Sequence, residues 1–407
     1  MRIPASSIQV SPLDALFTRI SFTVSADRQG LSFHYWIDLP RELAPGAIPG
    51  NAQALLLLPM ACYFHEDIVI TEAVDSVLLE NLKGVQQIWH TWYPQLAPIR
   101  IEAPAAAPGA AQRNGHTLAS FSGGIDSFFS LLRHRDRVSH LLSIAGFNTP
   151  IDDLDNMKRD LGPVAATFGK RLVPVRTNIR YGDNPETPYS IQELMSHMAH
   201  GCLLAAIAHL MEQQFRVYVI PATHSYSQLH PYGSHPLTDP LFSSAKVQIE
   251  HDGAAFDRIE RTELVAGSTD AMAVLHVCWQ DFSLGNCSRC EKCLRTMATL
   301  DLVGGRENAR TFDWSTYSLE RVAAAWLPTE SERAFFVEIA RAARARGRVT
   351  LAQAAEAALT SSRRKARLRN VGETMRLFVV RNIKSHRLTR SIWYGLKARR
   401  DRARART

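Results

Sequence analysis

Apolar and polar positions follow different periods in different parts of the chain. Residues 31–39 alternate between apolar and polar side chains, which is typical of a half-buried strand, and residues 74–92 carry apolar side chains at helical spacing. Residues 1–102 are therefore predicted to form a small α+β domain of unassigned role. Residues 103–115 are rich in Ala, Pro and Gly and show no apolar period, which indicates a linker.

From residue 116 to residue 304, short apolar strand candidates alternate with helical stretches. The strand candidates are 117–121, 138–147, 172–177 and 217–221, and the helical stretches are 127–134, 153–168 and 191–213. This alternation predicts βαβ units and an α/β fold with a doubly wound parallel sheet. Residues 305–407 are expected to form a helical, alanine-rich region that ends in a basic tail.

Composition narrows the class of protein. The 407 residues are 46% hydrophobic, which is enough for two or three domains with their own cores. The apolar runs are too short to span a bilayer and the start lacks a signal-peptide pattern, so we expect no transmembrane segment and a cytoplasmic location.

The net charge of +8 is concentrated at one end of the chain. Residues 363–406 contain sixteen Lys and Arg against two acids, so the rest of the chain is mildly acidic. Such a tail can contact nucleic acid, a protein or an anionic surface, or it can serve only as a solubilising end. The sequence leaves the oligomeric state open.

The first strand-to-helix junction after residue 116 carries the sequence Ser-Gly-Gly-Ile-Asp-Ser, residues 122–127. Glycines let backbone N–H groups converge on an anion, and the helix N-terminus adds its dipole. The serine hydroxyls can donate to pyrophosphate, and Asp126 is predicted to cap the helix or to hold Mg²⁺. The simpler interpretation is a turn that only caps a helix. The predicted nucleotide site consists of Ser122, Gly123, Gly124, Asp126 and Ser127, with Asp126 and Ser127 as catalytic residues, and Ile144 from the next strand.

The chain lacks the G-x-x-x-x-G-K-[ST] motif, so it has no phosphate-binding lysine of the kinase type. A loop without that lysine suits cleavage between the α- and β-phosphates of ATP. Three arginines elsewhere could pair with phosphate in bidentate fashion: Arg258, Arg261 and Arg295.

Four of the six cysteines are crowded into sixteen residues with the spacing C-x8-C-x2-C-x2-C. Four thiolates that leave no position for water indicate a closed, tetrahedral, structural zinc site. An iron–sulfur cluster is the alternative, but the next cysteine and the proline of the bacterial ferredoxin motif are replaced here by Met297 and Ala298. The predicted ligands are Cys278, Cys287, Cys290 and Cys293, whereas Cys62 and Cys202 lie in apolar runs and are predicted to be core residues.

Together, the S-G-G-x-D-S loop and this cysteine spacing resemble the cyano-deazaguanine synthase family, the nitrile synthases of queuosine-precursor biosynthesis, over residues 116–304. The resemblance implies a PP-loop ATP-pyrophosphatase fold in which the loop holds ATP and the cysteines hold zinc. It implies that ATP adenylates the carboxylate of carboxy-deazaguanine and that ammonia displaces AMP, giving an amide and then a nitrile. Relatives in this family occur in phage-defence operons.

Two departures from the family change the expected substrate. Where the family has a stretch containing Y-P-D-C-R, this chain has residues 224–239, which contain several His, Tyr and Ser residues, so the acid or the final step is expected to differ. The leading domain and the basic tail are additions to the family pattern, which makes a larger acceptor conceivable, either a protein or a nucleic acid.

The stretch from residue 223 to residue 239 follows a predicted strand and combines polar side chains with turn-forming Pro and Gly. That composition is typical of a substrate loop at the carboxyl end of a parallel strand, and also of an ordinary polar loop. His197 and His200, three apart on a predicted helix, are expected to be structural rather than metal ligands. The candidate substrate residues are Tyr226, Tyr232, His235 and Asp239, together with Arg295, which follows the last predicted zinc ligand as it does in the family.

The expected function is that of an AMP-forming ligase or synthase that uses ATP, Mg²⁺ and structural Zn²⁺. It would adenylate a small-molecule acid for attack by ammonia or an amine. A tRNA-thiolating enzyme of the same fold is an alternative, but it would need a reactive cysteine pair near the loop, and every paired cysteine is assigned to metal. A non-catalytic nucleotide-binding scaffold is the third possibility.

Overall fold

The computed structural model describes residues 1–107, 115–147, 149–180, 189–280 and 285–365. The chain divides into two compact units, Met1–Tyr317 and Ser318–Thr407. The boundaries predicted near residues 102, 115 and 304 remain predictions. Most of the expected linker and nearly all of the basic tail lie outside the described residues.

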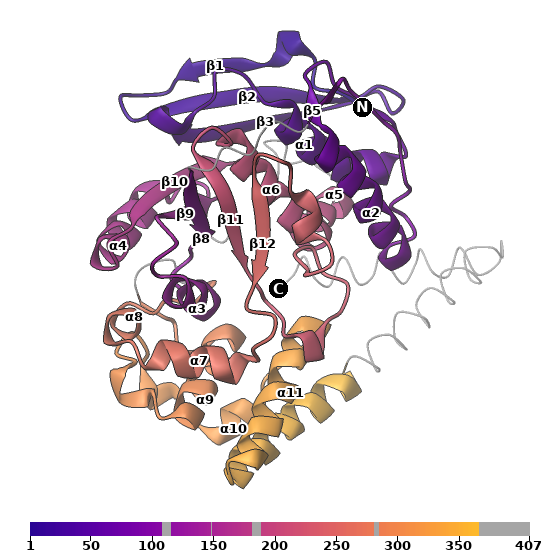
Figure 1. Cartoon of the computed structure of the whole chain (residues 1–407). Helices are drawn as coiled ribbons and strands as arrows, with labels where there is room; N and C mark the ends of the chain where they lie inside the picture. The colour runs from indigo at the N-terminus through magenta and orange to yellow at the C-terminus, as the bar shows by residue number, and fades with distance from the viewer. Residues whose placement is uncertain (108–114, 148, 181–188, 281–284, 366–407) are drawn as a thin grey trace, which may run out of the picture. The chain divides into compact units, whose positions relative to one another are not determined.

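The first unit is built on one eight-stranded sheet with the order β1-β2-β3-β10-β9-β8-β11-β12 (Figure 1). Every neighbouring pair from β10 to β12 is parallel. These five strands are β8 (His116–Ser120), β9 (His140–Ala145), β10 (Arg171–Thr177), β11 (Phe215–Pro221) and β12 (Gln248–Asp252). The predicted α/β class with a large parallel sheet is confirmed, and the order is Rossmann-like. The specific PP-loop fold remains a prediction.

Three antiparallel strands extend this sheet at the β10 edge. They are β1 (Gln9–Pro12) and the hairpin of β2 (Phe17–Ala26) and β3 (Leu31–Pro40), and β3 pairs with β10. Most of β2 alternates between buried and half-buried positions, as expected of a strand with one face on the core. Residues from the expected leading domain therefore continue the same sheet that carries the serine-glycine loop.

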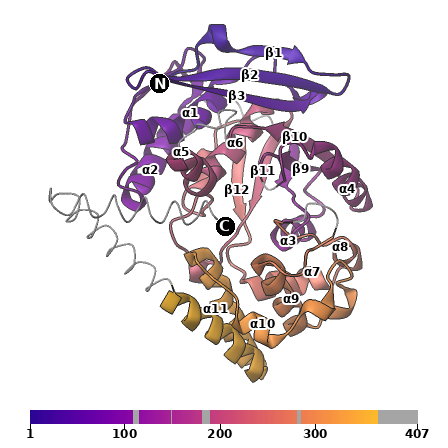
Figure 2. The same cartoon turned by 180° about the vertical axis from the view of Figure 1, so that it is seen from behind.

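Helices cover both faces of the sheet, and Figures 1 and 2 show α1 and α2 on the opposite side from α4. Neighbouring residues of one strand pack into different cores. Leu142 belongs to the core that contains residues of α1 and α6, whereas Leu141 belongs to the core that contains residues of α3 and α9. Helices on both faces explain why β9 is buried along its whole length. The helices of this unit are α1 (Gly50–Phe64), α2 (Ser76–Trp92), α3 (Ile125–Arg133), α4 (Leu154–Thr167), α5 (Tyr189–Glu193), α6 (His200–Leu210), α7 (Arg258–Ala266), α8 (Thr269–Ala273) and α9 (Glu291–Val303).

Shorter elements connect these layers. Two parallel two-stranded pairs join β4 (Ile68–Val69) with β6 (Ile101–Glu102), and β5 (Val74–Asp75) with β7 (Ala105–Ala106). A π-helical turn, Leu194–Met198, lies between α5 and α6. Single 3₁₀ turns are formed by Ala5–Ser7, Arg41–Leu43, Tyr226–Gln228, Asp239–Phe242, Arg306–Asn308 and Trp314–Thr316.

The described part of the second unit is helical. It contains α10 (Leu319–Ala323) and α11 (Glu330–Ala345), and residues 349–365 are helical as well. A capping box formed by Thr329 and Glu332 starts α11 because it satisfies backbone N–H groups that the first turn leaves unpaired. None of the helices among the described residues is long and apolar enough to cross a bilayer.

A buried ion-pair cluster joins the hairpin to the parallel sheet. Asp38 of β3 is fully buried and pairs with Arg19 of β2 and Arg176 of β10, with N–O distances of 2.6 and 2.8 Å. Both guanidiniums also lie over the ring of Trp36, at 4.1 and 5.4 Å from its centroid. One carboxylate thus links three strands, so its charge and both arginines depend on one another.

We expect Asp38→Ala to lower the free energy of unfolding by roughly 2–4 kcal/mol. This loss of stability is smaller than the largest losses measured when a fully buried ion pair is broken. Arg19 and Arg176 keep 30% and 26% of their side chains exposed, so water can still solvate their charges. Urea unfolding followed by circular dichroism measures it. Glu80→Ala removes an exposed ion pair with Lys83 and is the control, with an expected effect below about 0.5 kcal/mol. Equal effects of the two substitutions would contradict the role assigned to Asp38.

Candidate functional site

The candidate site lies where the chain order of the strands reverses. From β8 the chain proceeds to β9 and β10 on one side, and later to β11 and β12 on the other. In open α/β sheets, ligands bind outside the carboxyl ends of the strands at such a reversal. The serine-glycine loop follows β8, and residues 222–239 follow β11, so both predicted segments leave the sheet at this edge.

The serine-glycine loop has the conformation that the glycines allow. Gly123 has a φ of 74°, in the left-handed region that favours glycine, and Gly124 is the extended N-cap residue of α3. The Ser127 hydroxyl donates to the Gly124 carbonyl at 2.9 Å, and the backbone N–H of His276 donates to the Gly123 carbonyl at 2.9 Å. No side chain among the described residues caps the start of α3, so its first N–H groups point toward the loop.

Asp126 pairs with two buried arginines. Its carboxylate accepts from Arg258 and Arg261 of α7, with closest N–O distances of 2.8 and 3.0 Å. Burial of Asp126 opposes ionisation, but the two guanidiniums outweigh it and lower the pKa of this carboxyl below its usual value. Asp126 is therefore ionised at neutral pH. The cap role predicted for it is replaced by this ion pair, since Gly124 is the N-cap residue.

Arg261 also connects the two strand ends that flank the reversal. Besides Asp126, its guanidinium donates to the backbone carbonyls of Ala222 and Thr223, which directly follow β11. The loop after β8 and the segment after β11 are thus held by one side chain. This arrangement makes the carboxyl edge of the sheet a single polar site.

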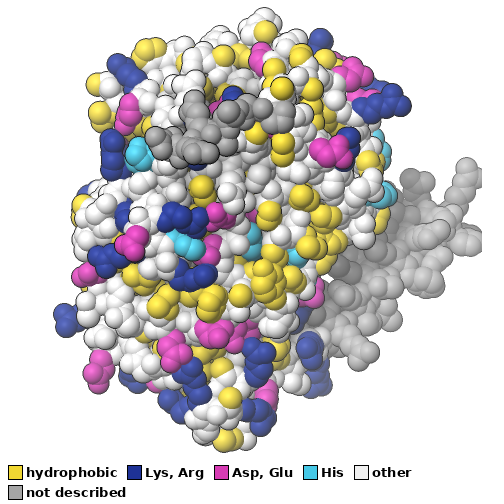
Figure 3. Space-filling view, viewed as in Figure 1, with side chains coloured by type: hydrophobic (Ala, Val, Ile, Leu, Met, Phe, Trp, Pro, Cys, Tyr) yellow, Lys and Arg dark blue, Asp and Glu magenta, His cyan; other side chains and the backbone are white. Residues whose placement is uncertain are grey.

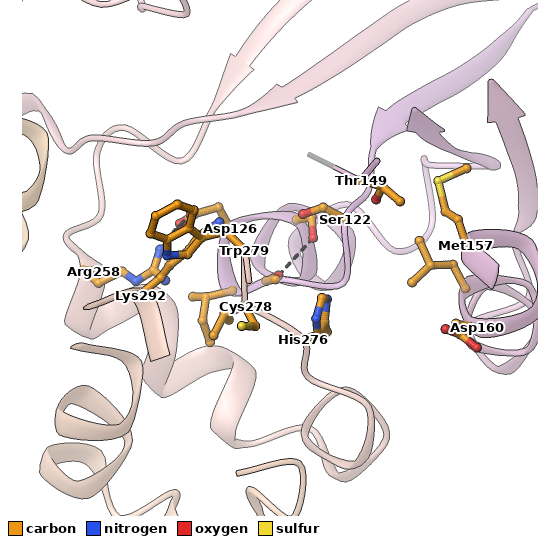
Figure 4. A pocket seen from close by; sticks show the side chains of 15 residues that line it. Ser122, Asp126, Thr149, Met157, Asp160, Arg258, His276, Cys278, Trp279 and Lys292 are labelled. Atoms are coloured by element: carbon orange, nitrogen blue, oxygen red, sulfur yellow. Dashed lines mark hydrogen bonds and ion pairs between the residues drawn. The ribbon is translucent and has the colours of Figure 1, made fainter. Parts of the chain in front are cut away.

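A cavity of about 120 Å³ opens beside the loop (Figure 4). Its two ends differ in chemistry: Met157 and Asp160 line one end, whereas Arg258, Trp279 and Lys292 line the other. The other lining residues are Ser122, Gly124, Ile125, Asp126, Ser127, Thr149, Leu161, His276, Val277 and Cys278. The cavity therefore includes four of the five predicted loop residues and one predicted metal ligand.

The four predicted ligand cysteines come together as the sequence predicts. Their sulfur atoms all lie within 4.8 Å of one another, and the Sγ atoms of Cys278 and Cys290, and of Cys287 and Cys293, are 4.0 and 3.9 Å apart. Tetrahedral Zn–S bonds of about 2.3 Å require sulfur atoms about 3.8 Å apart. This cluster can hold a metal ion such as zinc, and the donor set and the spacing fit that ion.

Local hydrogen bonds hold the cysteine cluster in place. The side-chain oxygen of Asn286 accepts from the backbone N–H groups of Val277 and Cys278, at 2.9 and 3.1 Å. Cys290 is the N-cap of α9, and hydrogen bonds from the Cys293 side chain and backbone lower the pKa of Cys290 to about 5. A thiolate is thus favoured at this helix N-terminus before any metal binds.

The cysteine cluster also places cationic residues at the cavity. Helix α9 begins directly after Cys290 and carries Lys292 and Arg295. Burial and the nearby Arg295 and Arg258 lower the pKa of Lys292 to about 8. Sequence reasoning missed Lys292, although its position between two metal ligands was a usable signal. It also missed Trp279, which follows the first ligand and is 57% exposed at the cavity.

One predicted substrate residue, Tyr232, belongs to a second polar group outside the cavity lining. Tyr232 is half-buried and makes edge contacts with His200 and His224, at centroid distances of 5.0 and 5.2 Å. Burial lowers the pKa of His200 to about 4 and that of His224 to about 3, so both rings are neutral. Tyr226 is 60% exposed. Among the described residues, no histidine belongs to a group with metal-binding geometry.

Asp239 organises the loop rather than facing the cavity. It is fully buried and accepts from the Ser234 hydroxyl, the His235 backbone and His251 Nδ1, at 2.6, 3.1 and 2.7 Å. His235 is also buried, with its ring against Trp92. The substrate roles predicted for these residues remain predictions.

Two further predicted site residues have clear structural surroundings. Arg295 is buried and pairs with Glu291 at 3.3 Å, one helical turn away. Ile144 of β9 is buried in the core formed with α1 and α6 and is not among the residues that line the cavity. Cys62 and Cys202 are core residues as predicted, and burial raises the pKa of Cys62 to about 12.

Fold and site together define an α/β protein with a glycine loop at the strand reversal and a four-cysteine cluster that can hold a metal ion. Comparisons with protein-family models, curated proteins and solved structures give no match to this chain. The resemblance to the cyano-deazaguanine synthases therefore depends on the loop and the cysteine spacing alone.

We expect the purified chain to contain about one zinc ion and Cys293→Ser to lose most of it, because a tetrahedral thiolate site needs all four ligands. Elemental analysis by mass spectrometry measures the metal. Cys62→Ala is the matched control, since Cys62 is a buried cysteine outside the cluster and its loss should leave the zinc content unchanged. Iron in place of zinc would show that the cluster holds a different centre.

Proposed function

We propose that this protein is an ATP-dependent, AMP-forming ligase or synthase that adenylates a carboxylate for attack by ammonia or an amine. The observation that carries the proposal is the serine-glycine loop at the N-terminus of α3, beside a cavity with buried cations. Backbone N–H groups at such a helix start are a binding site for phosphate. The absence of a P-loop lysine motif from the sequence favours cleavage at the α-phosphate.

The cationic end of the cavity supports an anionic ligand. Among the described residues, the guanidiniums of Arg258 and Arg261 share the carboxylate of Asp126, and the Lys292 ammonium lines the same cavity. Buried charge of one sign is costly unless a counter-charge neutralises it. The phosphates of ATP would supply that counter-charge where the loop can bind them.

The proposed chemistry needs positioning and charge neutralisation. A carboxylate oxygen of the acid attacks the α-phosphorus of ATP, and the bond from that phosphorus to the bridging oxygen breaks, so pyrophosphate leaves with the electron pair. Ammonia or an amine then attacks the acyl carbon, AMP leaves with the electron pair of the bond that breaks, and the nitrogen releases a proton, which gives the amide. A nitrile requires a second ATP, which activates the amide oxygen for removal. In this mechanism the loop orients the phosphates, Mg²⁺ would accompany ATP, and the nearby cations stabilise the charge that develops on pyrophosphate.

Cysteine placement disfavours the sulfur-transfer alternative. Four cysteines form the metal-type cluster, and the other two, Cys62 and Cys202, are buried with raised pKa values. A sulfur carrier needs an accessible thiolate. The described cysteines offer none outside the cluster, which supports attack by nitrogen rather than sulfur.

The identity of the acid follows from the resemblance alone, which points to a carboxy-deazaguanine-like compound. Residues 366–407, most of the basic tail through which a macromolecular acceptor could bind, lie outside the described residues. On the face shown in Figure 3, Lys and Arg side chains of the described residues are interspersed with Asp and Glu. We therefore propose ammonia or a small amine as the acceptor. An amine on a protein or nucleic acid is the second candidate acceptor.

We expect the protein to form AMP and pyrophosphate from ATP and carboxy-deazaguanine, with an amide or nitrile when ammonium is present. Asp126→Asn should lower AMP formation at least about 100-fold, because it removes the charge that holds Arg258 and Arg261 beside the loop. Mass spectrometry follows both products.

Asp136→Asn, at an exposed aspartate just after α3, is the matched control and should leave AMP formation unchanged. Both variants should retain their zinc. Formation of ADP and phosphate in place of AMP, or full activity of Asp126→Asn, would contradict the proposed function.

A further inference from the structure

Lys292 differs from the other cations at the cavity. Arg258 and Arg261 face Asp126, and Arg295 faces Glu291. Among the described residues, the Lys292 ammonium has no hydrogen-bond or ion-pair partner, and Asp126 and Glu291 act on it only at longer range. A side chain that lines a cavity with its charge unpaired is suited to an anion from outside the chain.

The position of Lys292 is set by the cysteine cluster. It is the second residue of α9, between the N-cap Cys290 and Cys293 in the first turn. Figure 4 shows its side chain beside Arg258 and Trp279, at the same end of the cavity as Asp126. The first turn of a helix tied down by two ligands is a rigid support, so the ammonium is held close to the serine-glycine loop.

Trp279 forms the wall next to this lysine. Its indole lines the cavity although more than half of it is exposed, and it directly follows the ligand Cys278. A large apolar ring at this place limits the water that can reach the cationic end. Electrostatic interactions with a bound anion are stronger where water is excluded.

We propose that Lys292 binds the β- and γ-phosphates of ATP and stabilises the pyrophosphate leaving group; this inference depends on the proposed function. In proteins with the G-x-x-x-x-G-K-[ST] motif, the loop itself supplies the lysine that binds these phosphates. Here the loop lacks it, and a lysine from a separate helix, α9, placed by the cysteine cluster, supplies the charge at the same cavity. Negative charge accumulates on pyrophosphate as the bond to the α-phosphorus breaks, so the ammonium stabilises the transition state more than bound ATP.

The test compares Lys292→Met with the wild-type protein in calorimetric binding of three ligands in the presence of Mg²⁺. The ligands are α,β-methylene ATP, inorganic pyrophosphate and AMP. We expect Lys292→Met to weaken the binding of α,β-methylene ATP and of pyrophosphate about 10- to 100-fold. The affinity for AMP should stay within about twofold of the wild-type value, because AMP lacks the phosphates that Lys292 contacts. Lys292→Arg keeps the charge and should recover most of the loss.

Two controls separate phosphate binding from folding. Lys83→Met, at an exposed lysine of α2, should bind all three ligands as the wild-type protein does. Zinc content, measured on every variant, should stay at the wild-type level in Lys292→Met. Lys292→Gln is a second neutral variant that keeps a polar side chain in the first turn of α9.

Each alternative result contradicts a different statement. If the wild-type protein binds neither α,β-methylene ATP nor AMP, the proposed function is wrong. If the wild-type protein binds them and Lys292→Met and Lys292→Gln bind α,β-methylene ATP equally well, only the role of Lys292 is wrong. If Lys292→Met weakens the binding of AMP and of α,β-methylene ATP equally, Lys292 supports the fold of the site and does not bind the β- and γ-phosphates.

Discussion

The candidate site depends on one carboxylate shared by two buried guanidiniums. Asp126 lies in the first turn of α3, and its partners Arg258 and Arg261 come from α7, more than 130 residues later in the chain. Removing Asp126 would take the shared carboxylate from two buried guanidiniums, which is costly, whereas removing either arginine would leave Asp126 paired with the other. Because Arg261 also binds the carbonyls that follow β11, this group determines how the loop, the strand end and α7 are placed together.

The cysteine cluster has a consequence for function as well as for stability. It closes the region between β12 and α9, where Cys278 lines the cavity and Cys290 caps the helix that carries Lys292. A metal bound there would stabilise the folded loop and fix one wall of the cavity. The four-cysteine cluster and the serine-glycine loop thus line one cavity, so a change in one wall would alter the other.

The N-terminal hairpin shows how far local pattern is informative. Alternation over residues 31–39 predicts a strand, and β3 is found there. A pattern with a period of two identifies a strand but not its neighbour, so the pairing of β3 with β10 could not be predicted. Across that pairing, Asp38 of β3 binds Arg176 of β10, a residue 138 positions later in the chain. The leading residues consequently extend the sheet of the candidate nucleotide-binding fold.

Elements whose chemistry is local could be predicted from the sequence. The order of strands and helices from residue 116 to residue 221, the glycine loop at the start of α3 and the four clustered cysteines were all predicted, because each depends on residues close together in the chain. The three-dimensional structure was needed to show that Asp126 faces arginines rather than capping its helix, and that Asp239 is a buried hydrogen-bond centre. It also placed Lys292 beside the loop. Those outcomes require charges from distant segments to converge at one edge of the sheet, and sequence spacing carries no information about such convergence.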